Sequence, residues 1–224
     1  MDFDPIAKTY DKMNRLMTLG IDRLWRRRAV KQVVDNHRCQ RFLDEAVGTG
    51  DMAADILRLA HPQSRLTGID ISAKMMSVAE QKLDLTRCTL LQADAEQLPF
   101  DDGSFDVVTI AFGIRNYQHR DVALREIYRV LKPQGRLLIL ELSYPDNPFL
   151  LWCYKIYACR IIPWLGGLVS GSREAYEYLP ASILRFPKPD QFVPILAQAG
   201  FDHIEHRAYT FGVCRQYIAS RWVL

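Results

Sequence analysis

Short apolar runs alternate with stretches of helical spacing between residues 41 and 142, and this pattern predicts the fold. The apolar runs predict strands near residues 41–46, 65–70, 88–93, 106–111 and 136–142. The helical patterns predict helices near 51–60, 72–83 and 120–131. Strands separated by helices are typical of a parallel sheet, because parallel neighbours can be joined only by a crossover connection.

Both ends of the chain depart from this alternation. Two helices are predicted before the first strand, near 5–17 and 21–34. After the fifth strand, helices are predicted near 148–162, 172–185 and 189–199, and strands near 202–209 and 213–221. Phe211 and Gly212 separate the last two strands as a hairpin loop, which makes that pair antiparallel.

The predicted fold is therefore α/β: a mostly parallel seven-stranded sheet with a C-terminal antiparallel hairpin and helices on both faces. A dehydrogenase would need further strand–helix–strand units, for which the chain has no room. The arrangement is that of Rossmann-like class I methyltransferases. We expect one domain over residues 1–224, in which the N-terminal helices (about 1–36) and a helical insertion (about 146–187) form a substrate cap.

Composition restricts which ligands and which cellular compartment this domain is expected to have. The net charge of +3 is too small to imply binding to nucleic acid, and the five scattered cysteines predict neither a disulfide framework nor a metal site. The acidic start of the chain does not resemble a signal peptide, so a reducing cytoplasm fits. The apolar run 149–169 is interrupted by charged residues and a glycine pair, which makes it a poor membrane span.

The early part of the chain is basic. Its cations include Arg26, Arg27, Arg28, Lys31, Arg38 and Arg41. Two interpretations stay open: a solvated helix face, or contact with an anionic membrane surface that would hold the protein peripherally at the inner face of the membrane.

The most informative local motif is LDEAVGTGD, residues 43–51. Glycines at 48 and 50 allow a sharp turn and leave no side chain between the backbone and a ligand. Asp70 ends the next predicted strand, where a carboxylate can accept from a ribose hydroxyl. On its own this layout fits either NAD(P) or S-adenosylmethionine, and Asp70 could instead share a helix cap with Ser72.

A second acidic residue favours S-adenosylmethionine. Asp94 ends the third predicted strand, where its carboxylate can accept from the exocyclic amine of adenine while the Ala95 amide reaches a ring nitrogen. The alternative is an Asp that helps a loop to turn. Together with the glycine turn and the terminal hairpin, Asp94 favours a methyl donor over a dinucleotide.

Longer motifs narrow the comparison to one family. The stretches LDEAVGTGD, ADAEQLPF and RVLKPQGRLLILE resemble class I methyltransferases, and YDKMN (10–14), FGIRN (112–116) and the stretch from Ser172 to Pro187 narrow the match. From about Phe3 to Ile218 the chain resembles the ubiquinone/menaquinone biosynthesis C-methyltransferases. The resemblance implies methyl transfer from S-adenosylmethionine to a ring carbon of a prenylated quinol, such as demethylmenaquinol or a ubiquinol precursor, with S-adenosylhomocysteine as the product.

The resemblance also assigns site residues. The cofactor set that it implies is Gly48, Thr49, Gly50, Asp70, Asp94, Ala95 and Ala111. Arg115 and Asn116 would orient the quinol oxygens or a bound water, and Tyr10 would close over the cofactor. Arg115 cannot serve as a free base, because a guanidinium keeps its protons, so stabilising a developing phenolate suits it better.

Each of these roles has a structural alternative. Arg115 and Asn116 could form a turn that leads into a helix, and Tyr10 could be a packed tyrosine. His119 could be a base, although a loop histidine facing solvent is the simpler interpretation. Aromatic residues of the insertion could pack in a core or form an apolar lid, in which Tyr178, Ser182 and Phe186 are the expected substrate contacts.

Four positions differ from the pattern of the family. Ala46 stands where a glycine is common, Asp22 replaces a histidine, Ala111 replaces a serine and Gln134 replaces a glycine. These differences leave the quinone ring open. Two other functions are also kept: a methyltransferase of this fold acting on another aromatic or lipid-like acceptor, and a silent cofactor-binding subunit. A homodimer is compatible with the sequence.

Overall fold

All seven strands of the described part of the chain belong to one sheet. The computed structural model describes residues 4, 7, 9–164 and 173–222, apart from the side chains of 173–177. The order across the sheet is β3-β2-β1-β4-β5-β7-β6. Strands β1 to β5 run parallel, and β7 lies antiparallel to both β5 and β6. The predicted fold class is confirmed.

The parallel strands alternate with helices as the hydrophobic pattern predicts. In chain order the elements are β1 (Arg41–Glu45), α3 (Asp51–Leu59), β2 (Arg65–Asp70), α4 (Ala73–Glu80), β3 (Cys88–Gln92), β4 (Phe105–Ala111), α5 (Arg120–Val130) and β5 (Leu131–Leu142). Chain order reverses at β1 and β4, which are neighbours in the sheet. Ligands of open α/β sheets bind at such a switch point, beyond the carboxyl ends of the strands.

The remaining elements lie at the two ends of the sequence. Before β1 come α1 (Tyr10–Thr18) and α2 (Asp22–Val30). After β5 come α6 (Pro148–Ile156), the π-helical turn η3 (Tyr157–Ile161), α8 (Arg173–Arg185), α9 (Pro189–Gln198), β6 (Asp202–Tyr209), the short 3-10 turn η4 (Thr210–Gly212) and β7 (Cys214–Ser220). Residues 5, 6 and 8 of the predicted helix 5–17, residue 172 of the predicted helix 172–185 and the Gly166-Gly167 pair lie outside the described residues.

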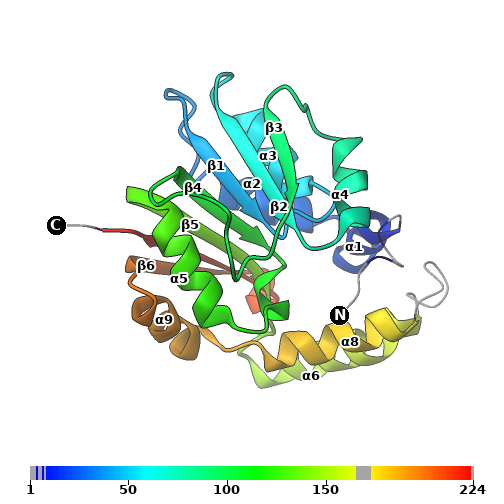
Figure 1. Ribbon diagram of the computed structural model, residues 1–224. Coiled ribbons are helices and arrows are strands. Elements are labelled where there is room, and N and C mark those ends of the chain that lie inside the picture. The colour runs from blue at the N-terminus through cyan, green and yellow to red at the C-terminus, as the bar shows by residue number, and fades with distance from the viewer. Residues whose placement is uncertain (1–3, 5–6, 8, 165–172, 223–224) are drawn as a thin grey trace.

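Helices cover both faces of the sheet. On one face α2, α3 and α4 pack on apolar side chains such as Phe42, Leu66 and Leu138. On the other face α5 and α9 pack on Leu43, Val108 and neighbouring side chains. Figure 1 shows α6 and α8 beyond the carboxyl ends of the parallel strands, where α8 contacts η3, the turn that continues α6. Side chains of α1, η3 and α8 pack together there, among them Met13, Ala158 and Leu179. None of the described helices is long and apolar enough to cross a membrane.

One strand differs from its predicted bounds. The sequence predicts that β5 starts near residue 136, yet it begins at Leu131 and contains a register shift against β4. The segment 132–135 bulges because Gln134 has a φ of 64° and its amide donates to the Arg221 carbonyl at 2.7 Å. Gly135 suits this bulge, since a Cβ there would lie 2.8 Å from the Lys132 carbonyl oxygen.

Candidate active site

Two adjoining cavities lie at the carboxyl edge of the sheet. The first has a volume of about 270 Å³ and is lined by the ends of β1, β2, β4 and the loop after β3. The second, of about 310 Å³, lies between α1, α2, η3, α8 and η4 and is lined mainly by apolar side chains. Tyr10 and Phe112 line both cavities, so they stand where the two spaces meet.

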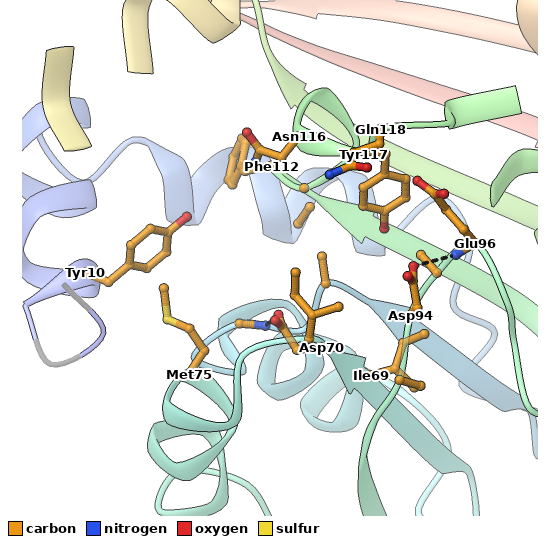
Figure 2. A pocket seen from close by; sticks show the side chains of 17 residues that line it. Tyr10, Ile69, Asp70, Met75, Asp94, Glu96, Phe112, Asn116, Tyr117 and Gln118 are labelled. Atoms are coloured by element: carbon orange, nitrogen blue, oxygen red, sulfur yellow. Dashed lines mark hydrogen bonds between the residues drawn. The ribbon is translucent and has the colours of Figure 1, made fainter. Parts of the chain in front are cut away.

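The first cavity contains most of the predicted cofactor residues. Its lining includes Gly48, Asp70, Asp94, Ala95 and Ala111. Figure 2 shows Tyr10 at one end of this space, Asp94 and Tyr117 at the other, and the Asp70 carboxylate between them. Two strand ends and two loops thus bring together carboxylates that are far apart in the sequence.

Asp70 is held by backbone amides. Its two oxygens accept from the Gly48 amide at 2.8 Å and the Ser72 amide at 2.9 Å. Burial raises the pKa of Asp70, and these two hydrogen bonds oppose the rise. The cap of α4 is Ser72 itself, whose hydroxyl accepts from the Met75 amide, so Asp70 faces the cavity rather than capping the helix.

Asp94 stabilises the turn of the loop after β3 and also lines the first cavity, whereas its contact with adenine stays a prediction. One carboxylate oxygen accepts from the Glu96 amide at 2.9 Å, which is the loop turn. The residue also lines the first cavity beside Ala95. Glu96 in turn accepts from the His119 amide at 2.8 Å, and this contact fixes the loop after β3 against the start of α5. His119 is exposed and does not line either cavity.

The three residues of the glycine turn have different surroundings. Gly48 lines the cavity with a φ of 54°. Thr49 turns away and donates to the Asp11 carboxylate at 2.5 Å, which ties α1 to the turn. Gly50 has a φ of 82° and lets the turn pack on α4, since a Cβ there would lie 3.0 Å from the Ala79 Cβ. The cofactor roles of Thr49 and Gly50 stay predictions.

The stretch after β4 provides the boundary between the cavities. Phe112 has a φ of 59°, in the left-handed region that non-glycine residues rarely adopt. Its amide donates to the Leu140 carbonyl at 2.7 Å, and its carbonyl accepts from the Arg115 guanidinium. A Cβ on Gly113 would lie 2.6 Å from the Ala46 Cβ, so Gly113 and the small Ala46 allow this turn to approach the glycine loop closely.

Arg115 lines the second cavity and is held in a buried ion pair. Its guanidinium donates to Glu141 at 2.8 Å, and its amide donates to the other oxygen of the same carboxylate at 3.1 Å. Both side chains are almost fully buried. Burial lowers the pKa of Arg115, but the charge and hydrogen bond of Glu141 together with the nearby Tyr10 and Tyr178 outweigh this and raise the pKa, so Arg115 stays a cation.

Asn116 lines the first cavity and contacts the helical insertion. Its side-chain oxygen accepts from the Tyr178 hydroxyl at 3.2 Å. Ser182, one turn further along α8, accepts from the Arg115 Nε at 3.4 Å. Tyr178 and Ser182, two of the three predicted substrate residues, therefore form hydrogen bonds with the predicted pair Asn116 and Arg115.

Those substrate residues do not themselves line the apolar cavity. Their neighbours Leu179 and Ile183 line it instead. Phe186 is buried in the core, where its ring lies 4.9 Å from that of Phe192. A role for Tyr178, Ser182 and Phe186 in substrate binding stays a prediction.

Three site residues were missed by the sequence reasoning. Glu141 was readable as a charge at the end of an apolar strand, LLILEL. Phe112 gave no signal of its positive φ. Tyr117 lines the first cavity, and its hydroxyl donates to the buried Glu45 at 3.3 Å. Glu45 follows Asp44 in the glycine motif, where an acidic residue on a buried strand was the available signal.

Comparison with known proteins identifies the family. The model of the ubiE/COQ5 methyltransferase family matches residues 2–221. The chain belongs to this family. It is 45% identical, over 98% of its length and 92% of the relative's, to the ubiquinone/menaquinone biosynthesis C-methyltransferase UbiE of Syntrophotalea carbinolica. It is 42% identical to the demethylmenaquinone methyltransferase of Thermus thermophilus, over 98% of this chain and 99% of that one.

Solved structures agree on the fold. A SAM-dependent methyltransferase from Thermotoga maritima, described as a possible histamine N-methyltransferase, matches with a TM-score of 0.69. The match covers 98% of this chain and 97% of that one at 20% identity, so it supports the fold alone. Family and fold together confirm the expected methyltransferase of the Rossmann-like class.

Proposed function

We propose that this member of the family transfers a methyl group from S-adenosylmethionine to a ring carbon of a prenylated quinol. The observation that carries the proposal is the pair of adjoining cavities. One is polar and carries carboxylates; the other is apolar; they meet at Tyr10 and Phe112. The polar methyl donor and the apolar quinol acceptor would thus meet where the two cavities adjoin.

The residues of the first cavity fit the methyl donor. The Asp70 carboxylate, fixed by two amides, suits a ribose diol, and Asp94 with Ala95 suits an adenine edge. Gly48 leaves the wall free of a side chain beside Asp70. The donor would supply a methyl group on a sulfonium, which is already a good leaving group.

The residues at the boundary fit the acceptor. A ring carbon that gains a methyl group must also lose its proton to a base or a bound water, and the negative charge that develops on the ring oxygens needs hydrogen-bond donors. Burial raises the pKa of Tyr10, although the Arg115 charge opposes this, so the Tyr10 hydroxyl is protonated near neutral pH. Tyr10 is therefore suited to donate to a quinol oxygen, and the permanent charge of Arg115 to stabilise electron density on the ring.

Positioning and water exclusion would supply most of the acceleration. The walls of the second cavity include Trp25, Tyr154, Ile162 and Leu179, which exclude water from an apolar ring. The relatives' names mention both ubiquinone and menaquinone biosynthesis, so either ring type is a candidate.

Methyl transfer can be tested directly with the purified chain and labelled S-adenosylmethionine in detergent. Demethylmenaquinol and a demethylated benzoquinol precursor serve as the two acceptors. We expect label in at least one quinone product and equimolar S-adenosylhomocysteine. Binding of S-adenosylhomocysteine without incorporation into either acceptor would refute the proposed substrate class, and binding of NADH instead would refute the cofactor.

A Tyr10→Phe variant separates the boundary from the cofactor cavity. It keeps the ring that lines both spaces and removes only the hydroxyl. We expect turnover to fall by about tenfold to a hundredfold, the range expected for loss of one positioned donor. Affinity for S-adenosylhomocysteine, measured by calorimetry, should change little. Equal losses in turnover and affinity would remove the role proposed for the hydroxyl.

A further inference from the structure

The apolar cavity opens beside a group of exposed apolar side chains. Leu19 and Ile21 line the cavity and are 83% and 37% exposed. Leu24, one turn after Ile21 on α2, is 46% exposed, and Phe211 is 79% exposed next to the cavity residue Thr210. We call Leu19, Ile21, Leu24 and Phe211 the mouth cluster.

Specific contacts hold the two halves of the mouth cluster together. The Trp25 indole donates to the Thr210 hydroxyl at 3.0 Å, which ties α2 to η4 although the two segments are far apart in sequence. Leu19 and Phe211 have φ angles of 51° and 56°. Non-glycine residues adopt this region at an energetic cost, so the backbone presents two apolar side chains to solvent in strained conformations.

The surface around the mouth cluster is cationic. Arg28, one turn after Leu24, and Arg207 are exposed. Burial raises the pKa of Tyr209, and the charges of Arg207 and Arg28 oppose this rise, so both cations lie near Tyr209. Tyr209 directly precedes η4, so both cations lie beside the Phe211 side of the mouth.

The acidic residues of α1 and α2 do not offset these cations at the surface. Asp11 pairs with Lys82, and the buried Asp22 pairs with Arg26 at 2.8 Å. The exposed charged side chains of α2 are Arg23, Arg27 and Arg28, all of them basic, although Arg26 is buried. Exposed apolar side chains flanked by cations are the combination that binds an anionic lipid surface.

We propose that the mouth cluster inserts into the headgroup region of an anionic membrane, with Arg28 and Arg207 at the lipid phosphates. The inference rests on the proposed function in one respect: a prenylated acceptor would then pass from the bilayer into the apolar cavity without crossing water. The opening of the cavity between the same residues is what favours a bilayer over a protein partner.

Vesicle co-sedimentation with the full chain tests this. Vesicles of phosphatidylcholine alone are compared with vesicles that also contain phosphatidylglycerol, and binding should be stronger to the second kind. The double variant Leu24→Asp/Phe211→Asp should lose about tenfold or more in partitioning. Arg28→Glu should weaken partitioning several-fold on the vesicles that contain phosphatidylglycerol and leave it unchanged on phosphatidylcholine, because each cation near an anionic surface contributes about 1 kcal/mol.

The control variant also places an aspartate at an exposed leucine, but at a position outside the mouth cluster. Leu85 is 55% exposed and lies between α4 and β3, away from the mouth. Leu85→Asp should bind vesicles as the unmodified chain does. Affinity for S-adenosylhomocysteine, measured by calorimetry, should be the same in all variants and shows that each is folded.

The outcomes separate this inference from the proposed function. Unchanged vesicle binding by the double variant would overturn the membrane surface, even if quinol methylation is found. A dimer that dissociates in the double variant, with no effect on vesicles, would also overturn it and make the face an interface between copies. Vesicle binding that depends on the mouth cluster without methylation of any quinol would leave the surface standing and refute the proposed substrate.

Discussion

The buried pair of Arg115 and Glu141 gives the sharpest test of how the site is held together. The Glu141 carboxylate accepts from the Arg115 guanidinium at 2.8 Å, from the Arg115 amide at 3.1 Å and from the Leu142 amide at 2.7 Å. Replacement of Glu141 by Gln keeps the shape but removes the charge. Arg115, only 6% exposed, would then be a buried cation without a counter-charge.

The magnitude follows from the burial of both partners. Breaking a buried ion pair by removing one partner typically costs about 3–5 kcal/mol, because the remaining charge is left uncompensated. Gln retains an acceptor, so we expect Glu141→Gln to lower the free energy of unfolding by about 3 kcal/mol. Turnover should fall as well, because Arg115 also donates to the Phe112 carbonyl at the boundary between the cavities.

The assay is denaturant unfolding, with an exposed pair as the matched control. Arg129 and Asp102 also form an arginine–carboxylate pair at 2.8 Å, but the Asp102 side chain is 74% exposed. Asp102→Asn should cost at most about 1 kcal/mol. In the background of Arg115→Met, the Glu141→Gln change should cost far less than it does alone. Equal costs for Glu141→Gln and Asp102→Asn, or simple additivity with Arg115→Met, would refute the reasoning.

Three further predictions follow from single positions. Asp70→Asn should weaken S-adenosylhomocysteine binding about tenfold to a hundredfold in calorimetry, because it removes a charged hydrogen-bond acceptor. Asp106, which pairs with Lys132, is the control: Asp106→Asn should leave S-adenosylhomocysteine binding unchanged. Gly50→Ala should lower the melting temperature more than Gly20→Ala. Both glycines have a positive φ, but a Cβ at Gly50 would lie 3.0 Å from the Ala79 Cβ, whereas a Cβ at Gly20 meets nothing within 4 Å. Equal shifts in melting temperature would contradict the packing argument. Burial raises the pKa of Asp44 to about 7, so the folded state keeps a proton that the unfolded state releases near pH 4. Stability should therefore fall by up to about 4 kcal/mol as the pH rises from about 4 to 7; Asp44→Asn should flatten this slope in unfolding curves measured against pH, and an unchanged slope would exclude Asp44 as its source.

The lining of the first cavity was largely predictable because its residues follow strands directly. Gly48, Asp70 and Asp94 each come at or just after the carboxyl end of a parallel strand. Parallel strands end at the same edge of a sheet, so three local motifs converge once the strand order is known. The C-terminal hairpin was predicted from the two strands expected on either side of Phe211 and Gly212.

The apolar cavity and its surroundings were decided only by tertiary structure. Its walls come from α1, α2, η3, α8 and η4, whose relative positions depend on helix packing and not on the period of any one segment. The sequence predicted that Arg115 acts on the quinol oxygens but did not predict its counter-charge, which Glu141 supplies from the next strand of the sheet. It read Arg26 as part of a basic face, yet the side chain is buried between Asp22 and Asp51.

The physical reason is the range of the interactions involved. Hydrophobic periodicity, glycine turns and strand-end carboxylates act within a few residues, so the sequence alone determined the fold class, the family and the edge of the sheet where the strand-end carboxylates gather. Ion pairs, cavities and exposed apolar clusters arise where segments far apart in the chain meet. Only the folded chain decides which charges are neutralised, where Phe112 divides the two spaces, and that the apolar cavity opens beside Leu19 and Phe211.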